Sequence, residues 1–176
     1  MSLSQQPDGF ARALTKFKKG LDPSLAQQFS ICTLEDVRIL AGKIQLEQGP
    51  QGKLRHLQWL EPFIEAMTQL GTVIEVFTNA SEFICFIWGP IKFLLALAKT
   101  HLDSLNKLLE AYGKIASSIS GLERYKEAFQ SHPPLAKVLE DYYSDILNFH
   151  ERAFEVFRRP SMLLQSHFPF MKPTQL

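Results

Sequence analysis

The stretch that decides the fold reads Phe83-Ile84-Cys85-Phe86-Ile87-Trp88-Gly89-Pro90-Ile91-Lys92-Phe93-Leu94-Leu95-Ala96-Leu97-Ala98. Lys92 is its only charged residue, and Gly89-Pro90 lies near its middle. A helix needs about 20 consecutive apolar residues to span a bilayer, which is more than this stretch offers. A helix that is apolar on every side is typically buried inside a protein. The stretch therefore predicts a central core helix, and insertion into a membrane is the alternative.

Upstream of this stretch, residues 9–19 have the pattern of an amphipathic helix. Phe10, Leu14 and Phe17 follow the spacing i, i+4, i+7 and form one apolar stripe. The basic residues of the segment lie mainly on the opposite face: Arg12, Lys16, Lys18 and Lys19. This basic face is either the solvated side of a helix packed on a bundle, or a surface that binds an anionic membrane or a partner protein.

Capping signals mark where the next two helices begin. Asp22-Pro23 places an N-cap residue before a proline at the first helical position. Thr33-Leu34-Glu35-Asp36 resembles a capping box with Asp in place of Glu, and its helix is expected to run to about Gln48. Gly49-Pro50-Gln51-Gly52 then predicts a loop. Two further helices are therefore expected before residue 49.

Apolar residues at helical spacing continue through the rest of the chain, without strand-like alternation. They predict helices over the ranges 54–79 with a kink or restart at Pro62, 102–119, 122–129 and 133–159. The inward residues of the last helix are expected to be Leu135, Val138, Tyr142, Ile146, Phe149, Ala153 and Val156. The sequence thus predicts an all-α fold, a single bundle of about seven helices over residues 1–159, with a long C-terminal helix. Residues 160–176 are expected to form a poorly ordered tail.

Composition limits the classes of function. Nineteen basic residues against eighteen acidic ones leave a net charge of +1, which gives no overall attraction to nucleic acid. Cys32 and Cys85 stand far apart without the spacing of metal ligands, so no metal site is expected. Residues 1–10 are polar and lack the apolar core of a signal peptide. We therefore expect a cytoplasmic protein, with peripheral contact to a membrane as the alternative.

No catalytic or cofactor-binding motif is found in the sequence. Residues 49–54 contain two glycines and a lysine, but not at the spacing of a phosphate-binding loop. His150-Glu151 begins like a zinc-protease motif, but Phe154 stands where the second histidine is needed. His150 is instead expected to be a hydrogen-bonded residue at the boundary of the core. The sequence therefore predicts a protein that is not an enzyme and holds no cofactor.

The segment Trp88 to Phe93, Trp-Gly-Pro-Ile-Lys-Phe, resembles a specific block of a fungal domain of unknown function. That domain stands at the N-terminus of NACHT and ankyrin proteins of the NLR-like (STAND) class. Within the block, Gly89 permits close approach of another helix, and Pro90 frees a backbone carbonyl. Lys92 can extend to solvent or pair with an acidic residue. We expect Trp88 and Phe93 to be buried.

The similarity extends over about residues 10–159. It implies a non-catalytic signalling or interaction module, the effector or adaptor part of an NLR-like protein, in self/non-self recognition or regulated cell death. Such a module needs a protein partner, which the resemblance does not identify. The alternative function is a peripheral membrane-binding domain that acts through its basic N-terminal helix.

Overall fold

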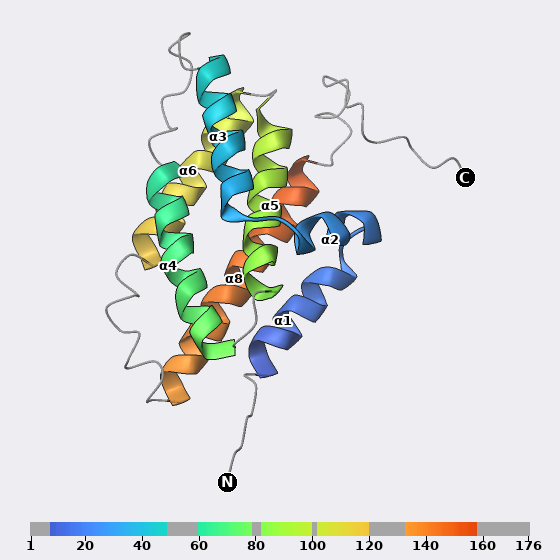
Figure 1. Ribbon diagram of the computed structural model, residues 1–176, viewed down its shortest axis with the longest axis vertical. Coiled ribbons are helices and arrows are strands. Elements are labelled where there is room, and N and C mark those ends of the chain that lie inside the picture. The colour runs from blue at the N-terminus through green and yellow to red at the C-terminus, as the bar shows by residue number, and fades with distance from the viewer. Residues whose placement is uncertain (1–7, 49–59, 79–81, 100–101, 120–132, 158–176) are drawn as a thin grey trace, which may run out of the picture.

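The computed structural model describes residues 8–48, 60–78, 82–99, 102–119 and 133–157 (Figure 1). These residues form seven helices and no strand: α1 (Asp8–Lys19), α2 (Pro23–Ser30), α3 (Leu34–Gln48), α4 (Leu60–Thr78), α5 (Glu82–Ala98), α6 (Leu102–Ile119) and α8 (Pro133–Phe157). The predicted all-α bundle with a long C-terminal helix is confirmed. The loop expected at 49–52, the helix expected at 122–129 and the tail 160–176 lie outside the described residues.

Helix α5, light green in Figure 1, is the axis of the bundle. It contacts each of the other six described helices. Its buried residues are spread around the helix and include consecutive positions from Phe86 to Ile91. The central core helix predicted from residues 83–98 is therefore confirmed. Among the described helices, none combines the length and the apolar character needed to cross a membrane.

Gly89 sets how closely α5 approaches α2. A Cβ atom at position 89 would lie 2.6 Å from the Cβ of Phe29 and 2.7 Å from its Cα. Because these atoms belong to or adjoin the backbone of α2, they cannot move aside as the end of a flexible side chain can. Glycine at position 89 is thus required for this helix crossing, as the sequence predicted.

The close crossing brings phenylalanine rings from four helices together. Phe29 of α2 packs against Phe86 and Phe93 of α5, with ring centroids 6.3 and 5.9 Å away. It also packs against Phe154 of α8, at 6.0 Å. Phe17 of α1 joins the cluster through Phe86 and Phe154. Aromatic pairs contribute about 0.5–1.5 kcal/mol each beyond their buried area, so the cluster links the N-terminal helices to the C-terminal one.

Helix α1 lies along α8 and runs in the same direction (Figure 1). The Glu140 carboxylate accepts a hydrogen bond from the backbone N–H of Gly9 at 3.2 Å, and Lys16 Nζ lies 3.4 Å from Asn148 Oδ1 further along. A carboxylate at the start of a helix also interacts favourably with the helix dipole. The apolar stripe of α1 is buried, as its spacing predicted: Phe10, Leu14 and Phe17. Both polar and apolar contacts therefore hold α1 on the bundle.

Helix α8 is rotated from its predicted orientation. Val138 and Val156 were expected to face inward, but they are 42% and 44% exposed. The buried residues of α8 are instead Leu139, Tyr143, Ile146, Leu147, His150, Phe154 and Phe157. Both sets follow helical spacing, but the second offers larger side chains and removes more apolar area from water. Tyr143 adds a hydrogen bond, donated to the backbone carbonyl of Phe83 at 3.1 Å.

The Gly89 contact predicts opposite effects for two glycine-to-alanine variants. Gly89→Ala places a methyl group against the backbone of α2, so we expect the free energy of unfolding to fall by ~1–3 kcal/mol, as for an overpacked core. Gly42→Ala in α3 is the matched control, because a Cβ there meets nothing within 4 Å. That variant should gain about 0.5–1 kcal/mol from helix propensity. Urea denaturation measures both, and a Gly89→Ala protein as stable as wild type would contradict the close crossing.

Candidate interaction groove

A hollow opens on the surface where α2, α3 and α5 meet. Its volume is about 380 Å³, near the lower end of the range for ligand pockets. Its apolar lining residues come from all three helices and the α2–α3 connection: Phe29, Ile31, Leu40, Phe93 and Ala96. We call this hollow the α2–α3–α5 groove. It offers mainly apolar surface to another molecule.

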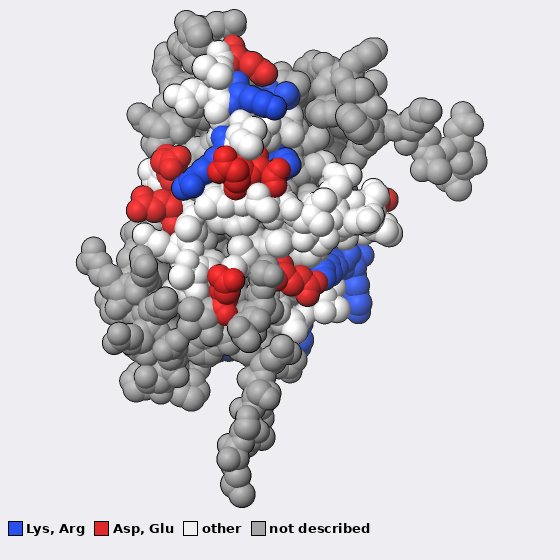
Figure 2. Space-filling view, viewed as in Figure 1, with Lys and Arg blue, Asp and Glu red and all other residues white. Residues whose placement is uncertain are grey.

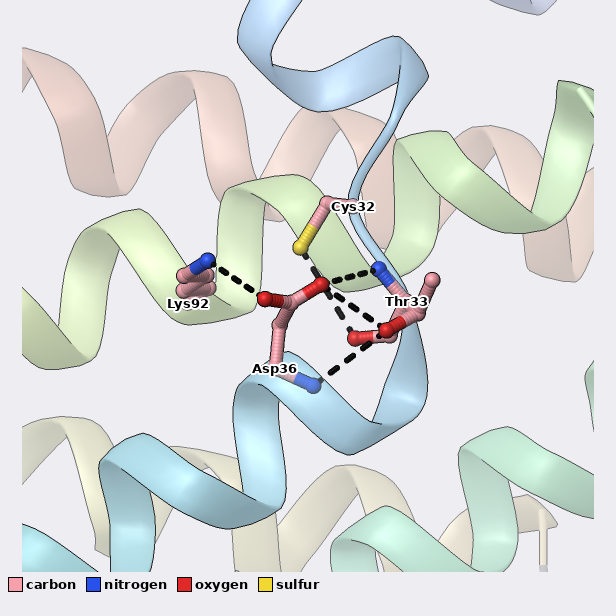
Figure 3. Close-up of polar contacts among 4 residues, drawn as sticks. All are labelled: Cys32, Thr33, Asp36 and Lys92. Carbon is pink, nitrogen blue, oxygen red and sulfur yellow. Dashed lines mark hydrogen bonds and ion pairs between the residues drawn. The ribbon is translucent and has the colours of Figure 1, made fainter.

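A polar cluster lies in the groove (Figure 3). Thr33 and Asp36 form the capping box predicted for the start of α3. Asp36 Oδ2 accepts hydrogen bonds from the Thr33 N–H at 3.0 Å and the Thr33 hydroxyl at 2.8 Å, and Thr33 Oγ1 accepts one from the Asp36 N–H at 3.3 Å. Lys92 of α5 donates to the other oxygen of Asp36, Oδ1, at 3.0 Å. The acidic partner of Lys92 is therefore the third residue of α3, whose carboxylate completes the capping box with the N-cap residue Thr33.

These hydrogen bonds keep the Asp36 side chain ionised. They lower the pKa of Asp36 to about 2, with the backbone N–H of Thr33 as the largest cause and Lys92 as the next. Burial raises the pKa of the neighbouring Cys32 thiol to about 11. At neutral pH the groove thus contains a carboxylate, an ammonium group and a protonated thiol. A protonated thiol is a poor nucleophile, so Cys32 acts as a small apolar residue here.

The rim of the groove carries no charge along one side. Residues 23–34, which include α2 and the start of α3, contain no Asp, Glu, Lys or Arg. Figure 2 shows a corresponding area without charged side chains over α2. Ile31 stands at this rim with 75% of its surface exposed. Ile31 thus extends the apolar surface of the groove to its rim.

Three of the six residues of the block, Trp88 to Phe93, reach the groove. Gly89, Lys92 and Phe93 line it. Trp88, at 4% exposure, and Pro90 are buried in the bundle. The expectation of a buried Phe93 is wrong, because Phe93 is half-buried where it lines the groove. The block therefore serves both the core and this surface.

Neither side of the groove is evident from the sequence. Leu25 and Phe29 form the buried stripe of α2. Ile31 follows this helix in the chain and is not part of the buried stripe. The other usable signal was the charge-free run 23–34. Neither signal indicates a groove until α5 is known to lie beside α2.

Lys18 differs from the other three basic residues of α1 in its contacts. Those three are exposed: Arg12, Lys16 and Lys19. Lys18 is half-buried, because it pairs with Glu82 of α5 and its Nζ lies 4.7 Å from the centroid of the Phe86 ring. A cation over an aromatic face is worth about 0.5–1 kcal/mol at an exposed site. Lys18 therefore helps to hold α1 in place.

His150 lies in the core and not at its boundary. Its side chain is fully buried, and its Nε2 lies 3.5 Å from the hydroxyl oxygen of Tyr112. Burial lowers the pKa of His150 to about 3, so the ring is neutral at pH 7. Its Nδ1 has no hydrogen-bond partner among the described residues. The rotation of α8 explains the correction, because it turns the His150 face of the helix inward.

Residues 58–176 match the domain of unknown function DUF7708. No curated protein and no solved structure matches the chain. The matched range contains α4, α5, α6 and α8. The α5 side of the groove therefore lies inside the matched range, and the α2–α3 side precedes it.

Because Asp36 belongs to both the capping box and the ion pair, we predict that the stability of the fold depends on pH. The variant Asp36→Asn should remove this dependence. We expect this variant to lose ~0.5–1.5 kcal/mol at pH 7, because asparagine keeps an acceptor oxygen but loses the charge that strengthens the hydrogen bonds from Thr33 and Lys92. Asp36 has a pKa of about 2 in the folded protein, against about 3.9 in an unfolded chain. Its contribution is therefore present above pH 4 and is lost as the pH falls through 2. Thermal unfolding of both proteins between pH 7 and pH 2 should show the difference narrowing below pH 4, and a constant difference would contradict this role.

Proposed function

The chain belongs to the DUF7708 family, and we propose that it is a non-catalytic interaction module that binds a protein partner in the α2–α3–α5 groove. The observation that carries this proposal is an apolar hollow with an exposed isoleucine at its rim and a fixed ion pair inside it. Ile31 differs from the other exposed apolar residues, such as Leu46, because it adjoins the apolar lining of the groove. A partner that covers this side chain removes its apolar area from water.

The size of the groove fits an anchor residue of a partner. Full burial of one aliphatic or aromatic side chain contributes about 1.5–3 kcal/mol. Ile31 is 75% exposed, so its burial and that of the entering side chain both add to affinity. Interfaces commonly depend on a few such anchors in desolvated pockets. The groove therefore supplies the centre of an interface, and α2 and α3 supply its surroundings.

We propose a signalling role, as an adaptor or effector module like those at the N-terminus of fungal NACHT proteins. Support comes from position: Gly89, Lys92 and Phe93 belong to the block that resembles those modules, and all three line the groove. The block therefore coincides with a surface that can bind a partner as well as with the core.

Peripheral membrane binding through α1 is the second candidate. It is favoured by the exposure of Arg12, Lys16 and Lys19 on one helix. Each basic residue contributes about 1 kcal/mol near an anionic leaflet. The apolar stripe of α1 is buried against the bundle, so a docked α1 binds through charge alone. Such binding is weak and sensitive to salt.

The groove proposal predicts that partner capture depends on Ile31. We expect Ile31→Asp to remove one or more specific partners from material captured in the source cells, because a carboxylate at the rim cannot be buried without a counter-charge. Leu46→Asp in α3 is the matched control, since Leu46 is 79% exposed and does not line the groove. Quantitative mass spectrometry compares the three proteins.

Both positions are exposed, so each variant should keep its stability within about 0.5 kcal/mol of wild type, which thermal unfolding checks. Partners that persist with Ile31→Asp, or that are lost equally with both variants, would argue against binding in the groove.

The membrane candidate predicts salt-sensitive binding to anionic vesicles and none to neutral ones. The test variant is Lys16→Glu with Lys19→Glu, which leaves the Lys18–Glu82 pair intact. We expect at least a tenfold loss of co-sedimentation, because two attractive charges of about 1 kcal/mol each become repulsive. Lys43→Glu with Lys107→Glu is the control of equal charge change, at exposed lysines of α3 and α6. Equal binding by both double variants would reject a specific role for α1.

A further inference from the structure

The charges in the groove define the kind of group that fits there. Building on the proposed function, we propose that the groove takes an electrically neutral segment of the partner: an apolar side chain next to an uncharged amide group. The Asp36–Lys92 ion pair then recognises the amide, and the apolar walls hold the side chain.

The hydrogen-bonding capacity of the ion pair supports an amide. An ammonium group has three N–H donors. Among the described residues, the hydrogen-bond acceptor for Lys92 is Asp36. Asp36 Oδ2 accepts two hydrogen bonds from Thr33, whereas Oδ1 accepts the one from Lys92. Each carboxylate oxygen can accept two. The pair thus offers N–H donors and one acceptor position side by side, and an amide carries the complementary carbonyl and N–H.

The same pair disfavours charged groups. The two charges lie 3.0 Å apart, so a carboxylate that approaches Lys92 also approaches Asp36, and a cation that approaches Asp36 also approaches Lys92. Attraction to one partner is therefore largely cancelled by repulsion from the other. The incoming charge must also lose water against walls formed by Phe29, Phe93 and Leu40. Moving a neutral amide from water into the groove costs less free energy than moving a charged group. The amide can also form hydrogen bonds with both Lys92 and Asp36.

The uncharged rim of the groove also affects which partners are attracted from a distance. Residues 23–34 contain no charged side chain, so this side of the groove does not attract partners through charge. Binding should therefore depend little on ionic strength, because screening weakens only interactions between charges. This separates the groove from the exposed basic residues of α1, whose binding is salt-sensitive.

Three small probes with the same aromatic ring test the inference. At about pH 6, N-acetyl-L-phenylalaninamide is neutral, N-acetyl-L-phenylalanine is an anion and L-phenylalaninamide is a cation. The measurement is NMR titration of the full chain with labelled methyl groups, followed at Ile31 and Ala96, which line the groove. We expect saturable shifts with the neutral probe and roughly fivefold or more weaker binding of either charged probe. Affinity for the neutral probe should change less than about twofold between 50 and 500 mM salt.

Charge variants sharpen the test. Asp36→Asn leaves the ammonium of Lys92 alone and should shift the preference to the anionic probe. Lys92→Gln leaves the carboxylate alone and should shift it to the cationic probe. Ile31→Asp should weaken the neutral probe, and Leu46→Asp should not. Absence of binding by the neutral probe, preference of wild type for a charged probe, or unchanged preference in both charge variants would overturn the inference.

The outcome is distinguishable from failure of the proposed function. If partner capture requires Ile31 but the neutral probe does not bind, the groove is an interface but the proposed selectivity for a neutral group is wrong. If the probes behave as expected but capture is independent of Ile31, the selectivity stands and the proposed interface is wrong.

Discussion

Helices α2 and α5 pack at their observed distance only because residue 89 has no side chain. With the backbone of Phe29 2.7 Å from where a Cβ would stand, any other residue separates the two helices. The Phe29 ring would then lose its contacts with α5 and α8. Lys92 follows Gly89 by three residues, close to one helical turn. The crossing that Gly89 permits therefore also decides where the ammonium group meets the cap of α3.

The polar cluster of the groove contributes more to position than to stability. Side chains of Lys92 and Asp36 are 44% and 38% exposed, and exposed ion pairs contribute only about 0–1 kcal/mol. Two hydrogen bonds from Thr33 already hold the Asp36 carboxylate in place. The ion pair with Lys92 therefore restricts this carboxylate little further. The capping box thus has two roles: it begins α3 and it presents a fixed acceptor to α5.

Local features were predictable from the sequence, and contacts between distant segments were not. The capping box at Thr33, the glycine crossing and the buried stripe of α1 depend on residues close together in the chain or on one residue type, and all three are confirmed. Asp36 and Lys92 are 56 residues apart, so no spacing rule links them. The rotation of α8 was missed because two apolar stripes of similar period compete on that helix, and only its neighbours decide between them. For the same reason no part of the groove was predicted, and Phe93, which lines it, was expected to be buried.

The hydrogen bond between Gly9 and Glu140 joins residues 131 positions apart, which has a consequence during synthesis on the ribosome. Helix α1 is translated first, but the carboxylate that caps it is among the last parts of the bundle to be made. At about 5–20 residues per second, roughly 7–26 s pass between the two. Throughout that interval the apolar stripe of α1 has no α8 to pack against. Part of this apolar stripe therefore stays uncovered in the nascent chain until α8 is made, whereas the finished bundle buries all of it.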